Sequence, residues 1–172
     1  PLVQLSNGVK VMSEIALVTG ANRGIGLSIA TKLHAEGFTV IGTHRSSPPS
    51  KTGFASVECD ITVPESIESA FTTIEGEFGP VQVLVANAGI TKDNLLPRMS
   101  EEDFSSVIEA NLTSAYRLTK RAIKPMMKTK WGRIILISSV VASGGQAGQA
   151  NYAASKAGLV GLGRSIAKEF AS

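Results

Sequence analysis

The fold is decided by the stretch EIALVTGANRGIGLSIATKLHAEG, residues 14–37. It opens with an apolar run at 14–19, which predicts a buried β-strand, and continues into a turn with three closely spaced glycines. After the turn, Ile25, Ile29 and Leu33 recur at helical spacing, and Gly37 supplies a stop signal. The stretch therefore predicts a strand, turn and helix unit whose turn can approach a phosphate group.

The same alternation of strands and helices continues along the chain. Further strands are expected at 38–43, 55–60, 81–86 and 133–138, and further helices at 64–78, 100–128 and 152–170. The long helix is expected to break near Asn111 and to be kinked or ended by Pro125. Residues 44–53 are too rich in Pro, Ser and Gly for a helix. Apolar strands separated by helices predict a parallel sheet covered on both faces, a Rossmann-type doubly wound α/β fold in one domain.

Composition fits an ordinary globular domain. The chain has 172 residues, is 43% hydrophobic and carries a net charge of +3 from scattered Lys and Arg, so no nucleic-acid partner is expected. A single cysteine excludes an internal disulfide and fits a reducing cytoplasm; Cys59 is expected to be an inert core thiol. With only two histidines the chain has no metal-ligand spacing, and no apolar run approaches a membrane span.

Residues 1–11 stand apart from this pattern. They lack the apolar core of a signal peptide, and Met12 directly precedes the first strand expected. We interpret 1–11 as a leader upstream of the natural start, or alternatively as a short disordered arm, and 12–172 as the domain.

The glycine-rich turn carries the first chemical motif. Gly20, Gly24 and Gly26 are spaced G-x-x-x-G-x-G, which allows a tight turn and lets backbone N–H groups approach a pyrophosphate at the helix N-terminus. No G-K-[ST] follows, which argues against a nucleoside-triphosphatase loop. The alternative is a purely structural turn between strand and helix.

The end of the second strand indicates which dinucleotide is bound. NAD-binding proteins usually place a carboxylate there for the ribose hydroxyls, but this chain has GTHRS at 42–46 and no acid. Arg45, and Arg23 in the first turn, can instead hold a 2′-phosphate through charge-assisted hydrogen bonds. This favours NADP over NAD, unless both arginines are simply solvated.

Three side chains are predicted to converge at one edge of the sheet. Tyr152 and Lys156 lie four residues apart and so share one helix face. Ser139 comes at the end of the strand expected at 133–138, on the same edge as the glycine-rich turn. Many helices contain a Y-x-x-x-K pair by chance, so the motif gains its weight from Ser139.

Taken in order, these motifs resemble those of the short-chain dehydrogenases/reductases. The resemblance covers about 15–170 and rests on T-G-x-x-x-G-x-G at 19–26, D-I at 60–61, N-A-G at 87–89, Asn111, Ser139 and Y-x-x-x-K at 152–156. Within that family, the segments 87–99 and 145–158 are most similar to 3-oxoacyl-[acyl-carrier-protein] reductases. The His44-Arg45 turn and the short loop after it resemble the actinobacterial type.

The resemblance implies roles for individual residues. Tyr152 would donate a proton to the substrate carbonyl, with the Lys156 ammonium favouring its phenolate form and also holding the nicotinamide ribose. Ser139 would orient the carbonyl, and Asn111 would position a relay water behind the lysine. Residues expected at the cofactor are Gly20, Asn22, Arg23, Gly24, Ile25, Gly26, Arg45, Asp60, Ile61, Asn87, Ala88, Gly89, Tyr152 and Lys156.

The resemblance also implies an activity and partners. It predicts NADPH-dependent reduction of 3-oxoacyl-[acyl-carrier-protein] in fatty acid biosynthesis, by a homotetramer in which the long helix and the last helix form one interface. Lys and Arg between 121 and 133 form a candidate docking patch for the acidic carrier protein: Arg121, Lys124, Lys128, Lys130 and Arg133. The ordinary alternative is a solvated helix end.

Family members continue well beyond residue 172, so we expect a C-terminally truncated chain whose substrate-covering portion is absent. Two other functions remain open. One is a related reductase that acts on a different thioester, such as acetoacetyl-CoA. The other is a catalytically weak fragment that binds nucleotide or only pairs with full-length subunits.

Overall fold

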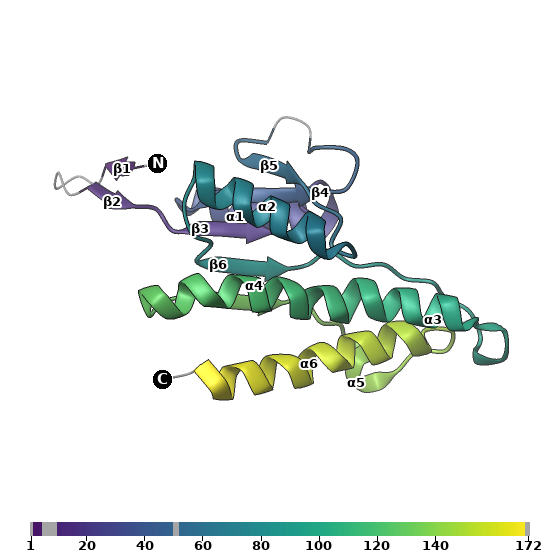
Figure 1. The fold of residues 1–172 in the computed structure, drawn as a ribbon. Helices are drawn as coiled ribbons and strands as arrows, with labels where there is room; N and C mark the ends of the chain where they lie inside the picture. Colours follow the sequence, from purple (N-terminus) through teal and green to yellow (C-terminus); the bar gives the residue numbers. More distant parts are fainter. Residues whose placement is uncertain (1, 5–9, 50–51, 171–172) are drawn as a thin grey trace.

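A five-stranded parallel sheet forms the centre of the molecule. We describe a computed structural model of residues 2–4, 10–49 and 52–170 (Figure 1). The strands follow the order β5-β4-β3-β6-β7, and all of their pairings are parallel. Their bounds are β3 (Ile15–Val18), β4 (Thr39–His44), β5 (Ala55–Glu58), β6 (Val83–Ala86) and β7 (Arg133–Leu136). The first strand of the sheet therefore lies at its middle, which is the doubly wound arrangement that the sequence predicts.

Helices cover both faces of this sheet. On one face, α1 (Gly24–Ala35) packs on β3 and β4 through Ala30 and its apolar neighbours. On the other face lie α2 (Pro64–Glu77), α4 (Ser114–Thr129) and α6 (Ala150–Phe170). The core between them and the sheet includes the fully buried Phe71, Leu84 and Leu118. The buried strands are apolar at successive positions because both of their sides face helices.

The long helical stretch is continuous but changes its winding in the middle. It consists of α3 (Glu101–Ile108), the π-helical turn η2 (Glu109–Thr113) and α4. Ser100 caps the start by accepting a hydrogen bond from the Asp103 N–H. The break expected near Asn111 is this π turn, which inserts an extra residue without ending the helix.

The expectation for Pro125 is wrong in part. Pro125 lies inside α4, which does not end there but continues to Thr129. The turns around it are held by the buried Ala122 and Met126, so packing on the sheet retains the helix despite the missing N–H. The chain leaves α4 at Lys130 in the left-handed conformation, with φ 54°.

Several boundaries differ from the predicted ones by a few residues. The last helix begins at Ala150 rather than at Tyr152, β6 begins at Val83 rather than at 81, and β5 ends at Glu58, before Asp60. Two short helices were not expected: η1 (Leu96–Arg98) and α5 (Val141–Gly144). In the segment before the domain, β1 (Leu2–Gln4) and β2 (Lys10–Met12) pair antiparallel with each other and not with the larger sheet. The division of the chain near residue 12 stays a prediction.

All five parallel strands end at the same edge of the sheet. Figure 1 shows the arrowheads of β3 and β6 pointing to the end of the molecule where α3, α5 and the start of α6 lie. This edge, which we call the carboxyl edge, carries the residues that follow each strand. In such sheets ligands bind outside the carboxyl ends of the strands, next to the point where the strand order reverses.

Candidate functional site

The glycine-rich turn after β3 has the shape of a phosphate cradle. Gly20 and Gly24 have φ of 66° and 55°, a backbone region that side chains other than glycine rarely adopt. A Cβ on Gly26 would lie 2.2 Å from the Gly20 carbonyl oxygen, so only glycine fits at that position. Open space surrounds Gly24, and Ile25 beside it is 66% exposed. The start of α1 thus presents backbone N–H groups to an accessible space, as an anion site requires.

The residues after β6 hold this turn in place. The Thr19 hydroxyl oxygen accepts hydrogen bonds from the backbone N–H groups of Asn87 and Ala88, each at 3.0 Å. The Asn87 side-chain amide donates to the Thr19 carbonyl oxygen at 2.9 Å. The amide nitrogen of Asn87 therefore shapes the glycine-rich turn from behind. Its expected contact with the cofactor remains a prediction.

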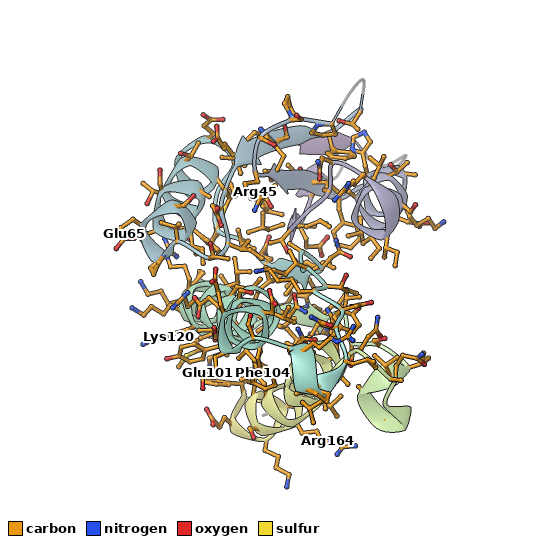
Figure 2. The ribbon with its side chains drawn as sticks, turned by 90° about the vertical axis from the view of Figure 1, so that its right-hand side faces the viewer. Arg45, Glu65, Glu101, Phe104, Lys120 and Arg164 are labelled. Carbon is orange, nitrogen blue, oxygen red and sulfur yellow. The ribbon has the colours of Figure 1, made fainter. Side chains whose placement is uncertain are left out.

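Arg45 and Asp60 follow neighbouring strands at the carboxyl edge. Arg45 is exposed just beyond the end of β4, and Figure 2 labels it in the upper half of the molecule, in a view onto this edge. Asp60 accepts hydrogen bonds from the Thr62 hydroxyl and backbone N–H at 2.7 and 2.9 Å. These bonds, and more weakly the charge of Arg45, hold the pKa of Asp60 below its usual range. The Asp60 carboxylate is thus engaged by its own turn, and Ile61 beside it is buried.

Tyr152 and Lys156 share one face of α6. The Lys156 ammonium lies 5.6 Å from the centroid of the Tyr152 ring. Lys156 is only 4% exposed, and its ammonium donates a hydrogen bond to the Ile137 carbonyl oxygen at 2.8 Å. Within the described residues no carboxylate pairs with it, and burial lowers the pKa of Lys156. The structure thus brings a buried ammonium up to the tyrosine ring, as the four-residue spacing predicts.

Two serines follow the end of β7. Ser139, the predicted one, is partly buried, and its hydroxyl oxygen accepts a long hydrogen bond of 3.4 Å from the Val141 N–H. Ser138, which the sequence analysis missed, donates from its hydroxyl to the Lys156 carbonyl oxygen at 2.9 Å. Ile137 and Ser138 therefore hold Lys156 at its ammonium and at its backbone. The two adjacent serines are visible in the sequence. The spacing of residues does not predict, however, that the Ser138 hydroxyl binds the backbone carbonyl of Lys156.

Asn111 is buried in the π turn and joins three segments. Its side-chain oxygen accepts from the Ile90 N–H at 2.8 Å, and its amide donates to the Ile90 carbonyl and the Ser155 hydroxyl, each at 3.0 Å. A Cβ on Gly89 would lie 2.7 Å from the Asn111 side-chain oxygen and 3.7 Å from the Lys156 ammonium. The absence of a side chain at Gly89 thus leaves room for the Asn111 side chain. The expected relay water stays a prediction, since the Asn111 side chain already holds protein groups.

The candidate docking patch loses one of its five members. Arg121 is not free: its guanidinium pairs with Glu75 at 2.6 Å and Glu68 at 2.9 Å and stacks over the Phe71 ring. These contacts join α4 to α2, so Arg121 serves the fold. The grouping of Arg121 with the docking lysines is therefore wrong, because charges on a neighbouring helix neutralise it.

The other basic residues of the patch remain at the surface. Lys124, Lys128 and Lys130 are exposed, and Arg133 lies over the Trp131 ring with 5.2 Å between its guanidinium carbon and the ring centroid.

The single cysteine, Cys59, is buried as expected, and burial raises the pKa of its thiol to about 11, which keeps it protonated and inert.

The described residues form neither a cluster of metal ligands nor a helix that could span a membrane. They contain no group of three or more His, Cys, Asp or Glu side chains placed to hold a metal ion. None of the helices in the described ranges combines the length and apolar character that crossing a membrane demands.

The chain is similar to one family of known proteins. Residues 14–172 match the family described as short chain dehydrogenase. The 3-oxoacyl-[acyl-carrier-protein] reductase MabA of Mycobacterium tuberculosis is 53% identical over 158 residues, which is 92% of this chain and 64% of the relative. The 3-oxoacyl-[acyl-carrier-protein] reductases FabG of Salmonella typhimurium and Escherichia coli are 51% and 50% identical over 166 residues, 92% of this chain and 68% of each relative. The chain thus spans about two thirds of the length of these curated relatives.

Proposed function

The chain belongs to the short-chain dehydrogenase family, and on that premise we propose that the protein reduces 3-oxoacyl-[acyl-carrier-protein] with NADPH. The observation that carries the proposal is the Tyr152 ring beside the buried Lys156 ammonium, at the edge where the glycine-rich turn lies. The relatives named above are reductases of this kind at 50–53% identity.

A nicotinamide dinucleotide fits the residues at the carboxyl edge. Gly26 packs against the Gly20 carbonyl and Asn87, whereas open space surrounds Gly24, so the turn can receive a pyrophosphate next to the start of α1. The first turn of α1 contains no acidic residue that would repel it. Of the predicted residues, we assign Gly20, Asn22, Arg23, Gly24, Ile25 and Gly26 to the phosphates. Asp60, Ile61, Ala88 and Gly89 would flank the adenosine.

Arg45 supports NADPH rather than NADH. No carboxylate follows β4, where one would receive the ribose hydroxyls of NAD. The Asp60 carboxylate, which follows the neighbouring strand, already accepts from Thr62 and is influenced by the charge of Arg45. The exposed guanidinium is therefore available to a 2′-phosphate through charge-assisted hydrogen bonds.

The side chains supply the proton and the orientation for reduction of a ketone. When bound, the reduced nicotinamide supplies the hydride to the keto carbon. Tyr152 donates its hydroxyl proton to the keto oxygen, so that hydride and proton together convert the ketone to an alcohol. Ser139 donates a hydrogen bond to the same oxygen and orients it, and Lys156 stabilises the negative charge left on Tyr152.

We further propose a homo-oligomer, with four subunits, that binds acyl carrier protein. Apolar side chains on the outer surfaces of the long helical stretch and the last helix support a subunit interface: Phe104 on α3, Tyr116 on α4 and Val160 on α6 are 41%, 46% and 38% exposed. In Figure 2, Phe104 lies on α3, and Lys120 and Arg164 lie at the outer edge of the molecule. Gly161 on α6 has open space around it, so a second helix can approach closely there.

The test is to identify the product with each of two carriers. Full-length protein is incubated with NADPH and either 3-oxobutyryl-[acyl-carrier-protein] or acetoacetyl-CoA, and the acyl products are analysed by mass spectrometry. The proposal expects the carrier-protein thioester to gain two hydrogen atoms with a kcat/KM well above that of the CoA thioester. A reversed preference would assign the protein to the related CoA reductases, and no reduction of either would reject the proposal.

A further inference from the structure

Asn151, the residue before Tyr152, is completely buried, with 0% of its surface exposed. Its side-chain amide donates to the Lys92 carbonyl oxygen at 2.9 Å and to the Asp103 carbonyl oxygen at 3.2 Å. Its side-chain oxygen accepts from the Tyr152 N–H at 2.8 Å. Both amide hydrogens and the oxygen therefore have protein partners, a complete set for a buried amide.

These partners lie in three different parts of the fold. Lys92 belongs to the loop that follows β6, Asp103 to α3, and Tyr152 to the first turn of α6. The N–H groups in the first turn of a helix have no acceptor inside the helix, so the bond from Asn151 also satisfies Tyr152. One buried side chain thus fixes where α6 begins relative to the loop and α3.

The other end of Tyr152 is held in the same way. The Ser155 hydroxyl donates to the Tyr152 carbonyl oxygen at 2.7 Å and accepts from the Asn111 amide, which is bound to Ile90. The backbone of Tyr152 is therefore connected at its N–H and at its carbonyl to the loop at 90–92. The loop itself is tied to the segment before α6 by an exposed bond from the Gln149 amide to Asp93 at 2.8 Å.

We propose that Asn151 is a positioning residue that sets the place of Tyr152 at the reacting carbonyl. The proposal rests on the proposed reductase function for its kinetic readout. Removing the amide takes one hydrogen bond from the Lys92 carbonyl, from the Tyr152 N–H and from the Asp103 carbonyl, which still accepts from the Ser106 hydroxyl. The first turn of α6 can then shift against the loop. A displacement of about 1 Å at a reacting group can lower turnover on the order of 100-fold.

The test compares Asn151→Ala with Gln149→Ala in the full-length protein. Gln149→Ala is the matched control because it removes an exposed bond between the same loop and the same end of α6. Active sites are counted by NADPH titration, so that unfolded molecules do not contribute to kcat. We expect Asn151→Ala to lower kcat per site on the order of 10- to 100-fold while the Kd for NADPH stays within about twofold. Gln149→Ala should leave both within about twofold.

Asn151→Asp provides a second variant with a pH readout. It keeps the oxygen that accepts from Tyr152 but turns a second oxygen toward two carbonyls, which a carboxylate repels and a protonated carboxyl can contact as a donor. We expect its kcat relative to the parent to recover as the pH falls from about 8 to about 6, since the carbonyls and burial raise the pKa of such a carboxyl. A constant ratio, or an Asn151→Ala kcat per site within twofold of the parent, would overturn the proposal.

Amide hydrogen exchange separates failure of this proposal from failure of the reductase assignment. If the parent protein reduces no 3-oxoacyl thioester, the reductase function fails, but positioning by Asn151 is still measurable. Exchange at the start of α6 should be faster in Asn151→Ala and unchanged in Gln149→Ala. Equal protection of the Tyr152 N–H in all three proteins would reject a positioning role whatever the reaction is.

Discussion

Arg45 is the residue on which the choice of cofactor depends. If it binds the 2′-phosphate with help from Arg23, charge-assisted bonds of about 1.5–3 kcal/mol each give NADPH at least a tenfold advantage over NADH. We expect Arg45→Ala to weaken NADPH binding while leaving NADH binding nearly unchanged. Fluorescence titration of both nucleotides measures this, with Lys32→Ala as an exposed control on the far part of α1. Equal affinities of the parent for the two nucleotides would contradict the assignment.

Burial in the folded state disfavours the charged form of Lys156. Burial lowers its pKa in the folded state below that of an unfolded lysine. At a pH between the folded and the unfolded pKa of Lys156, the unfolded chain binds more protons than the folded chain. Burial of the ammonium therefore lowers the free energy of unfolding at neutral pH. This cost is relieved as the pH rises toward 10.5 and the buried amine loses its proton. We expect Lys156→Met to abolish reduction yet raise the free energy of unfolding without nucleotide on the order of 1 kcal/mol at neutral pH.

Urea denaturation of nucleotide-free protein at several pH values measures this difference. The gain of Lys156→Met over the parent should be largest near neutral pH and should shrink as the pH approaches 10.5. A gain that grows with pH would contradict the sign of the pKa shift. Lys168→Met, at an exposed site in the last turn of α6, serves as the control.

Side chains differ in how far their sequence positions reveal their partners. Tyr152 and Lys156 were paired from the sequence because four residues place two side chains on one helix face. Asn111 was picked out only through family resemblance, and Asn151 and Ser138 were not picked out at all. Their partners are backbone atoms of Ile90, Lys92 and other distant segments, and no periodicity in the sequence encodes such contacts.

At the level of elements, α1 lies between the glycine-rich turn and Gly37, as predicted, because strong local signals mark both ends. Glycines in the turn fix its start, and Gly37 with φ 94° follows its end. For α4 the local signal misled: Pro125 predicts an end, but tertiary packing of Ala122 and Met126 carries the helix further. The starts of β6 and α6 were off by two residues, since boundaries are set by pairing and capping partners.

Arg121 connects two elements and is testable as such. Its guanidinium is mostly buried between Glu75, Glu68 and the Phe71 ring, and the hydrogen bonds that it donates to Glu75 raise its pKa further. We expect Arg121→Met to lower the free energy of unfolding by about 1 kcal/mol, because the substitution removes both ion pairs. The loss stays this small because solvent around the exposed Glu68 carboxylate screens part of the interaction. Lys124→Met on the same helix should change it by less than about 0.5 kcal/mol. Equal effects in chemical denaturation would mean that the ion pairs contribute nothing.

At the level of the whole molecule, the alternation of strand and helix segments in the sequence predicted the sheet and its covering helices. It did not predict which part of the surface binds a partner. Lys130 and Arg133 lie where α4 leads into β7, at the end of that strand opposite Ser139. They can therefore guide an acidic carrier protein only as part of a docking surface that serves a neighbouring subunit. Such charges act mainly on the association rate and are weakened by salt.

The docking role predicts a loss that depends on the substrate. Lys130→Glu with Arg133→Glu should lower kcat/KM for the carrier-bound 3-oxoacyl substrate on the order of tenfold at low salt, less at high salt, and leave a small thioester unaffected. Lys32→Glu, on the opposite face of the sheet, is the control for a change in net charge. Equal losses on both substrates would show that the two residues support the fold or the active site instead.

The central claim is that Tyr152 supplies the proton at a nucleotide-binding edge built by the glycine-rich turn. The most direct measurement is Tyr152→Phe in the full-length protein, with NADPH affinity and thioester reduction determined on the same sample. The ring still packs beside Lys156, so NADPH affinity should stay within about twofold, while turnover falls on the order of 100- to 10,000-fold. Turnover above about a tenth of the parent value would contradict the claim, because another group would then donate the proton.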